Sequence, residues 1–344
     1  MQQANKKRVG LSGWLIRGTV MAVLAITGQV AQADVSLLNV SYDVTREFYK
    51  DYNQAFVSHW KKTTGETVTV NQSHGGSSKQ ANSVAEGLPA DVITMNQATD
   101  IDILHTKGQL IPKDWAKRLP NNSAPTTSVT VILVRKGNPK KIKDWVDLAR
   151  PGVSVVIPNP KTSGNGRYTY LAAYGAVLKR GGDESSARAL VRGLFANVPV
   201  FDGGGRAATT TFAQRGIGDA LATFESEVPL IKGEFGGDYE VVYPSLTVLA
   251  ENPVSVVDKV VDKKGTRKQA EAYLKYLWSD EGQTVAAKRH LRPRSAKVLA
   301  QFAQDFPKVN TFTVGDVFGG WERAQREHFN DGGTYDQILL SGKK

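Results

Sequence analysis

The chain has 344 residues, a formal net charge of +11, 22% charged residues and no cysteine. This composition is typical of folded globular proteins, and it excludes disulfides, thiol nucleophiles, iron–sulfur clusters and cysteine-ligated zinc. The length exceeds what one hydrophobic core usually organises, so the sequence predicts two domains.

The first 33 residues have the pattern of a secretory signal. Four basic residues precede an uncharged stretch from Thr19 to Ala31, and Ala31-Gln32-Ala33 supplies small residues for cleavage. The apolar stretch is shorter than the roughly 20 residues that a membrane-spanning helix needs. We expect cleavage between Ala33 and Asp34 and a mature protein in the periplasm, without insertion into a membrane.

The mature sequence alternates short β-branched runs with longer helical patterns, which predicts an α/β fold with a largely parallel sheet. Strands are expected at 35–40, 67–70, 92–95, 129–134, 153–157, 198–201 and 239–242. Apolar residues at helical spacing predict helices around 48–56, 171–178 and 270–277. The last of these helices is expected to begin with a capping box formed by Thr266 and Gln269.

Two loops divide this pattern. A polar, proline-bounded loop at 119–125 is one boundary, and the segment 244–253 is the other. The sequence therefore predicts an outer α/β domain made of residues 34–125 and 254–344. Residues 126–253 are expected to form an inserted α/β domain, with a ligand cleft between the two.

Four predicted strands end in Gly-, Ser-, Asn- or Thr-rich loops that lead into a helix, at 40–46, 72–80, 158–168 and 201–209. The first backbone N–H groups of a helix lack intrahelical partners and lie at the positive end of its dipole. Glycine lets a ligand approach such N–H groups closely. In open α/β sheets these loops gather at the carboxyl ends of the strands, so the pattern predicts an oxyanion held between domains. The loops match neither the P-loop nor the dinucleotide-binding motif, which argues against nucleotide binding.

Several of these segments resemble the periplasmic sulfate- and thiosulfate-binding proteins, in the same order along the mature chain. The matching segments are SYDVTR (41–46), QSHGGSSKQ (72–80), PNPKTSG (158–164), RGIGD (215–219) and FGGW (318–321). The resemblance implies the cluster-II periplasmic-binding-protein fold, in which two α/β domains close on one ligand. It also implies delivery of that ligand to an ABC importer, with no catalysis and no cofactor. We expect the protein to be a monomer.

The same resemblance assigns the ligand contacts. It implies that the oxyanion accepts hydrogen bonds from the Ser163 hydroxyl and from the backbone N–H groups of Asp43, Ser77, Gly164, Asn165 and Gly205. Arg167 and Arg206 are implied as supporting residues behind these contacts. Phe224 stands where sulfate-binding members carry a tryptophan with a donating indole, so one hydrogen bond is missing. The residues around Phe224 are more similar to the thiosulfate-binding branch, and the sequence leaves the choice between the two ligands open.

Other functions were weighed against this interpretation. A secreted hydrolase of sulfate or phosphate esters would need a metal cluster or an activated nucleophile. No two of the five histidines are spaced as metal ligands: His59, His74, His105, His290 and His328. A receptor for molybdate or phosphate is a further alternative. A site made only of donors disfavours phosphate, whose O–H would face another donor, and Asp43, the nearest carboxylate, is expected to cap a helix.

Basic residues between 288 and 297 and an isoelectric point of about 9.6 raise the possibility of nucleic-acid binding. Export and the lack of a known nucleic-acid-binding motif in the sequence argue against that function.

Overall fold

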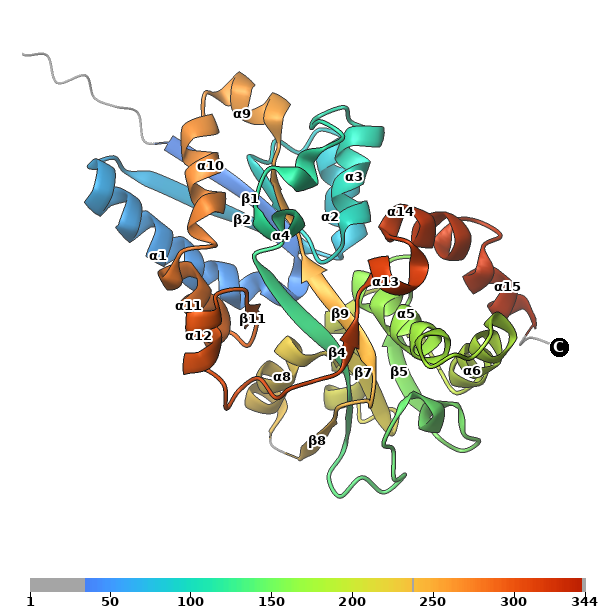
Figure 1. Ribbon diagram of the computed structural model, residues 1–344. Coiled ribbons are helices and arrows are strands. Elements are labelled where there is room, and N and C mark those ends of the chain that lie inside the picture. Colours follow the sequence, from blue (N-terminus) through green and yellow to red (C-terminus); the bar gives the residue numbers. More distant parts are fainter. Residues whose placement is uncertain (1–34, 237, 342–344) are drawn as a thin grey trace, which may run out of the picture. The chain divides into compact units, whose positions relative to one another are not determined.

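The computed structural model describes residues 35–236 and 238–341, which fold around two β-sheets (Figure 1). The expected signal at 1–33 and its cleavage position lie outside the described residues. Within the described ranges, no helix combines the length and the apolar composition that crossing a membrane requires.

The first sheet has the strand order β10-β3-β1-β2. Its three parallel strands are β1 (Val35–Tyr42), β2 (Val68–Gly75) and β3 (Val92–Thr94), and β10 (Val254–Val256) is antiparallel to β3. Successive side chains of a strand point to opposite faces, so Leu37 and Val40 enter different hydrophobic cores. Helices therefore cover both faces of this sheet.

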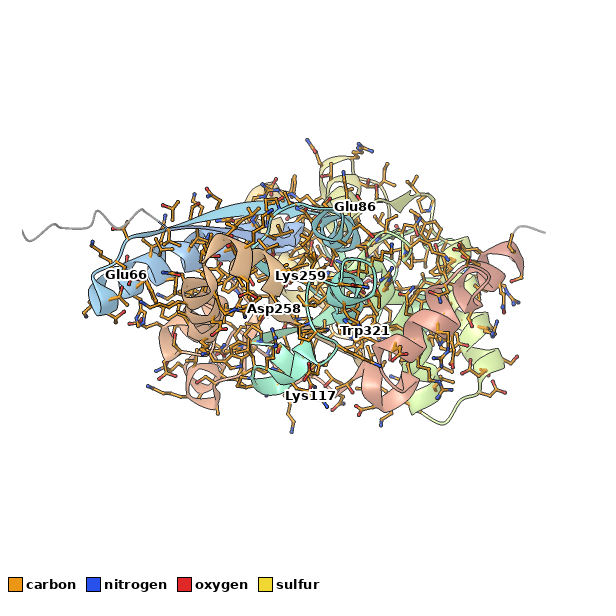
Figure 2. All side chains as sticks on the ribbon, turned by 90° about the horizontal axis from the view of Figure 1, so that it is seen from above. Glu66, Glu86, Lys117, Asp258, Lys259 and Trp321 are labelled. Atoms are coloured by element: carbon orange, nitrogen blue, oxygen red, sulfur yellow. The ribbon has the colours of Figure 1, made fainter. Side chains whose placement is uncertain are left out.

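One face of the first sheet packs on α1 (Arg46–Thr64), α9 (Asp258–Lys264), α10 (Arg267–Tyr276) and α11 (Asp280–Lys288). The other face packs on α2 (Ser77–Ala85) and α3 (Ala98–Thr106). Figure 1 shows α10 and α1 on one side of β1 and β2, and Figure 2 labels Asp258 at the start of α9.

The second sheet has the order β12-β9-β4-β7-β5-β6, and β8 and β11 also pair with β4. It is mixed, because β5 is parallel to β6 and β7 whereas β4 is antiparallel to β7, β8, β9 and β11. Its strands are β4 (Thr126–Arg135), β5 (Val155–Pro158), β6 (Phe201–Asp202), β7 (Ala220–Phe224), β8 (Tyr239–Val242), β9 (Thr247–Asn252), β11 (Arg292–Pro293) and β12 (Thr311–Phe312).

Helices also pack around the second sheet and its neighbouring segments. They are α5 (Gly164–Lys179), α6 (Glu184–Ala196), α7 (Gly205–Thr209), α8 (Val228–Phe235), α12 (Ala296–Gln301), α13 (Val314–Phe318), α14 (Trp321–Ala324) and α15 (Thr334–Ser341). The short α4 (Pro120–Ser123) directly precedes β4.

Most of the predicted strands are present. Those expected at 35–40, 92–95, 129–134 and 239–242 are confirmed as β1, β3, β4 and β8. The strand expected at 198–201 is reduced to β6, because the N–H of Val198 bonds to the carbonyl of Phe195 in a turn. The sequence analysis missed β7, whose five residues include two alanines, and β9, which lies inside the predicted boundary loop at 244–253.

The chain passes between the sheets along β4 and β9, whose paired ends run side by side through the centre of Figure 1. β4 follows the segment that contains α4, and β9 continues through Pro253 into β10 of the first sheet. The chain returns to the second sheet at β11, which pairs with β4, and again at β12, which pairs with β9.

The last described residues pack with the second sheet. Phe312, Phe318, Phe329 and Tyr335 share one hydrophobic core with β5, α5 and α6. This arrangement differs from the sequence-based division, which placed residues 254–344 together in the outer domain. No local pattern in the sequence predicts this return, because the strand β12 has only two residues.

Helix α10 starts at the predicted position, but the predicted capping box is wrong. Thr266 precedes the helix, yet its hydroxyl donates to Asp91 and makes no side-chain cap. Asp91 is fully buried and also accepts from Lys264 and from the N–H of Leu38. A buried carboxylate needs several donors, and this demand draws the Thr266 hydroxyl away from the helix.

The core of the second sheet encloses a histidine. The Nδ1 atom of His328 lies 2.7 Å from the Tyr170 hydroxyl, and the rings of Tyr174 and Phe318 pack against the imidazole. Burial lowers the pKa of His328 from 6.5 to about 4. The folded state therefore favours neutral His328, whereas the unfolded chain takes up a proton below about pH 6.5.

We predict that His328 makes the protein lose stability as the pH falls from 6.5 towards 4. The shift corresponds to about 3 kcal/mol, which is fully present above the upper value. Urea unfolding of the native protein and of His328→Gln at several pH values measures this loss, and the variant should show a shallower acid slope. Parallel curves for the two proteins would contradict the prediction.

Candidate functional site

Four strands end directly before a helical turn or helix. β1 leads into the turn Asp43–Thr45 and then α1, β2 leads into α2, β5 leads through 159–163 into α5, and β6 leads through Gly203 and Gly204 into α7. Each start presents backbone N–H groups that have no intrahelical acceptor. Two of these junctions come from the first sheet and two from the second, as the sequence predicts.

The junctions of the two sheets touch one another. A Cβ atom built on Gly164 would lie 2.1 Å from Oδ1 of Asn96, which follows β3. A Cβ on Gly204 would lie 3.6 Å from Oδ2 of Asp43, and a Cβ on Gly76 would lie 3.7 Å from the carbonyl oxygen of Thr162. The backbone of the second-sheet loops thus lies directly against the loops of the first sheet.

Ser77 is the first residue of α2, and its side chain forms a hydrogen bond within the protein. The Ser77 hydroxyl donates to Asp100, and the Ser78 hydroxyl donates to the same carboxylate at 2.8 Å. The guanidinium of Arg167 lies 3.8 Å from Asp100, although the two residues belong to helices of different sheets. Asp100 is fully buried. This carboxylate therefore connects the starts of α2 and α5, and the Ser77 backbone N–H lies at the positive end of its helix dipole.

The start of α5 contains three of the predicted site residues. The Ser163 side chain accepts from the N–H of Gly166 at 3.4 Å, which makes Ser163 the N-cap and leaves its own proton available for donation. Gly164 and Asn165 follow as the first helical residues. Asn165 was expected to act only through its backbone, but its side chain also forms hydrogen bonds. Its Nδ2 donates to Glu227 at 2.9 Å and to Thr223 at 3.2 Å.

Gly205 begins α7 and packs against the same group. A Cβ at Gly205 would lie 3.3 Å from Nδ2 of Asn165 and 3.4 Å from Oε1 of Glu227. Burial, followed by the nearby charge of Asp43, raises the pKa of Glu227 to about 7, against hydrogen bonds from Thr223 and Asn165. Burial also raises the pKa of Asp43, while backbone N–H groups of Val44, Asp43 and Arg206 oppose that rise.

Phe224 ends β7 and is 2% exposed. Its ring packs edge-on against Tyr168 at 5.6 Å, inside the core of the second sheet. A phenyl ring has no hydrogen-bond donor, so this position contributes an apolar surface.

The two predicted supporting arginines differ in their surroundings. Arg167 is buried, and its Nε donates to the carbonyl of Pro160 at 2.9 Å, inside the loop that precedes α5. The Arg206 side chain is about half exposed and pairs with Glu234 at 2.6 Å. Arg167 therefore holds the site loop from within, whereas the Arg206 side chain is directed to the surface pair.

A cavity of about 280 Å³ adjoins these junctions. Its lining includes Asp43, Arg206, Thr209, Glu227 and Ile231. The Thr209 hydroxyl is buried without a hydrogen-bond partner among the described residues. The polar wall of this cavity thus includes the two carboxylates that lie beside the helix starts, together with Glu47 and the cationic side chains of Arg46 and Arg206.

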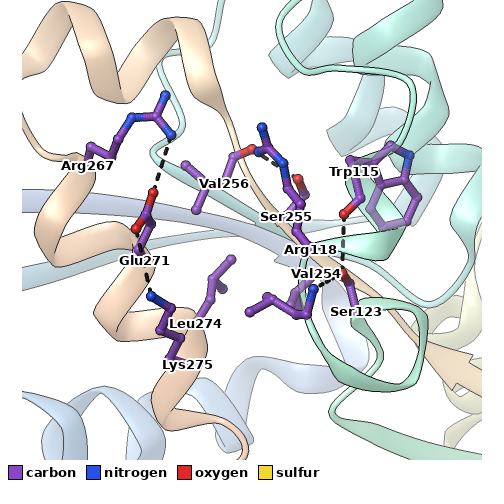
Figure 3. Close-up of a pocket in the computed structure, with 11 residues that line it drawn as sticks. Trp115, Arg118, Ser123, Val254, Ser255, Val256, Arg267, Glu271, Leu274 and Lys275 are labelled. Carbon is purple, nitrogen blue, oxygen red and sulfur yellow. Dashed lines mark hydrogen bonds and ion pairs between the residues drawn. The ribbon is translucent and has the colours of Figure 1, made fainter.

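A second cavity, of about 290 Å³, lies between β10, α10 and the turn Trp115–Lys117 (Figure 3). Arg118 and Arg267 both pair with Asp258, at 2.8 and 2.9 Å, and Arg267 also pairs with Glu271. Because its guanidinium groups are neutralised by neighbouring carboxylates, this cavity does not offer the free donors of the four junctions.

The features that suggested other functions have structural roles. In the described ranges, no group of three or more acidic or histidine side chains is arranged to hold a metal ion. His74 contacts Gln72 at 2.6 Å and the carbonyl of Tyr42. Four residues of the basic cluster pair with acidic partners: Arg289 with Asp51, Arg292 with Glu225, Arg294 with Glu251 and Lys297 with Asp280.

Sequence reasoning missed three residues at this site: Asn96, Asp100 and Glu227. A usable signal exists for Asn96 and Asp100, because both follow β3 at the same carboxyl edge as the glycine loops.

Residues 38–292 match the family of bacterial extracellular solute-binding proteins. A thiosulfate-binding protein of Pseudomonas aeruginosa is 64% identical over 94% of this chain and 98% of its own length. A sulfate-binding protein of Escherichia coli is 54% identical over 97% of this chain and 99% of its own. The solved structure of a sulfate-binding protein from Mycobacterium tuberculosis matches with a TM-score of 0.78 and 32% identity, covering 86% of this chain and 100% of that chain.

We predict that Glu227→Gln stabilises the protein at neutral and alkaline pH. The folded-state pKa of Glu227 is raised from 4.5 to about 7, so native stability is full below the lower value and falls as the pH rises through the upper one. The increase in the free energy of unfolding that the variant causes should rise from near zero in acid to about 3 kcal/mol above neutral pH. Urea unfolding across this range measures it, and a gain independent of pH would contradict the assignment.

Proposed function

This chain belongs to the bacterial extracellular solute-binding proteins, and within them to the sulfate- and thiosulfate-binding family, and from this membership we propose that it binds sulfate or thiosulfate for an ABC importer. It is a binding protein and not an enzyme. Its fold is the mixed α/β fold of periplasmic binding proteins, built on two mixed sheets.

The observation that carries the proposal is the meeting of four helix starts at the contact between the sheets. We propose that the ligand accepts from the backbone N–H groups of Asp43, Ser77, Gly164, Asn165 and Gly205 and from the Ser163 hydroxyl. Hydrogen bonds to a charged group contribute roughly 1.5–3 kcal/mol each. Six of them are sufficient for micromolar binding, about 8 kcal/mol, after substantial association costs.

The carboxylates beside these donors support a preference for fully ionised anions. Glu227 already accepts from Asn165 and Thr223, and Asp43 from backbone N–H groups. We propose that both carboxylates act on protein donors and not on the ligand, so the O–H of a hydrogen phosphate would remain unpaired at a cost of about 1–3 kcal/mol. Phe224 offers an apolar wall, which supports thiosulfate, with its less polar terminal sulfur, as the favoured ligand.

We propose that binding closes the two domains on the anion and that no covalent reaction follows. Two half-sites on separate sheets each hold part of the donors, and only the closed arrangement satisfies one anion with all of them. We propose a domain division at the segments around 125 and 253, with the residues from 311 onward joining the second domain. One chain supplies both half-sites, which supports a monomer. We also propose that the periplasmic form begins at Asp34, after removal of residues 1–33.

We predict that the purified mature chain binds thiosulfate or sulfate with one-to-one stoichiometry and a dissociation constant at or below about 1 μM. Isothermal titration calorimetry with thiosulfate, sulfate, phosphate and molybdate measures the affinity for each anion and so ranks them. The absence of a binding signal with phosphate would support a site that contains only hydrogen-bond donors. Tightest binding of phosphate would overturn that site, and no binding of any of these anions would overturn the proposed function.

A second prediction tests the contact between the sheets. Gly164→Ala places a methyl group against the Asn96 side chain and should weaken anion binding by at least about tenfold, because the start of α5 can no longer lie against that side chain. Gly233→Ala is the control, since a Cβ on this helical glycine meets nothing within 4 Å.

Adding Asn96→Ala to Gly164→Ala removes the obstructing side chain and should restore part of the affinity. Calorimetry of the two single variants and the double variant measures this recovery. Native affinity in Gly164→Ala would show that the closed contact is not required for binding.

A further inference from the structure

Glu227 occupies a place that none of the expected ligand contacts explains. It ends the turn Glu225–Glu227 that follows β7, and it is 4% exposed. No cation pairs with its carboxylate within 4.0 Å among the described residues, and its hydrogen bonds come from Asn165 and Thr223. A buried carboxyl without a cation is costly, and it lies beside a site expected to take an anion.

The carboxylate touches both second-sheet loops of the site. Oε1 accepts from Nδ2 of Asn165, the second residue of α5, at 2.9 Å. Its two oxygens would lie 3.4 and 3.6 Å from a Cβ on Gly205, the first residue of α7. The starts of α5 and α7 come from β5 and β6, whereas Glu227 comes from β7, so one side chain from a third strand lies against two separate loops.

The position of Asn165 depends on this contact. Among the residues that the structure describes, Nδ2 of Asn165 has only Glu227 and Thr223 as acceptors, and Oδ1 accepts from the Thr169 hydroxyl at 3.5 Å. With the amide fixed, the backbone N–H groups at the start of α5 keep a defined direction. The absence of a side chain at Gly205 lets the backbone of α7 approach the same amide and carboxylate.

We propose that Glu227 is a positioning residue that fixes the α5 and α7 N–H donors relative to each other, through its hydrogen bond to Asn165. It does not contact the anion. This inference rests on the proposed function, because it concerns donors of the same site.

The test uses two replacements of Glu227 in the full mature chain, titrated with thiosulfate and with sulfate. Glu227→Gln keeps an oxygen acceptor for Asn165 and should bind within about twofold of the native protein. Glu227→Leu removes the acceptor at similar size and should lose about tenfold in affinity. Thermal unfolding without ligand shows that each variant is folded, and Glu240→Gln, at an exposed carboxyl outside the site, is the matched control.

A double-mutant cycle with Asn165→Ala separates positioning from a general structural effect. If Glu227 acts through Asn165, then Glu227→Leu causes no further loss of affinity once Asn165→Ala is present. Additive losses, or native affinity in Glu227→Leu, would overturn the inference while leaving the proposed function intact. A native protein that binds neither anion would instead overturn the function itself.

Discussion

The close approach of the Gly164 backbone to the Asn96 side chain is the constraint on which the site depends. The first residue of α5 lies so near Asn96 that a single methyl group could not be placed between them. Donors that are backbone N–H groups can reach a small anion only if the chain segments carrying them come within such distances. This short distance depends on the two sheets, on the strands that cross between them and on the glycines at the helix starts.

Buried carboxylates organise a site intended for an anion. Asp100 gathers the hydroxyls at the start of α2 and lies near Arg167, whereas Glu227 holds Asn165. Each acts on groups behind the donors, and each carboxylate accepts hydrogen bonds from protein side chains. Negative charge is thereby used to orient the positive ends of helices, and the N–H groups that face inward remain available.

The alternation of strands and helices and the four strand-to-helix junctions could be predicted from the sequence, because β-branched runs and glycine loops are local signals. The alanine-rich β7 and the two-residue β12 could not, since both depend on partners distant in the chain. The predicted cap of α10 is wrong for the same reason, because the Thr266 hydroxyl donates to Asp91, which is distant in the chain. At the site, Asn165 was expected to act through its backbone, and only the packing of β7 shows the use of its side chain.

The second core is completed by the end of the chain. Tyr335 and Ile338, a few residues from the C-terminus, pack in the same cluster as Val155 and Leu171. A core that needs its last helix cannot close while that helix is still being synthesised. Folding of the second sheet therefore depends on contacts between segments that lie more than 150 residues apart in the chain, a separation that makes such contacts slow to form.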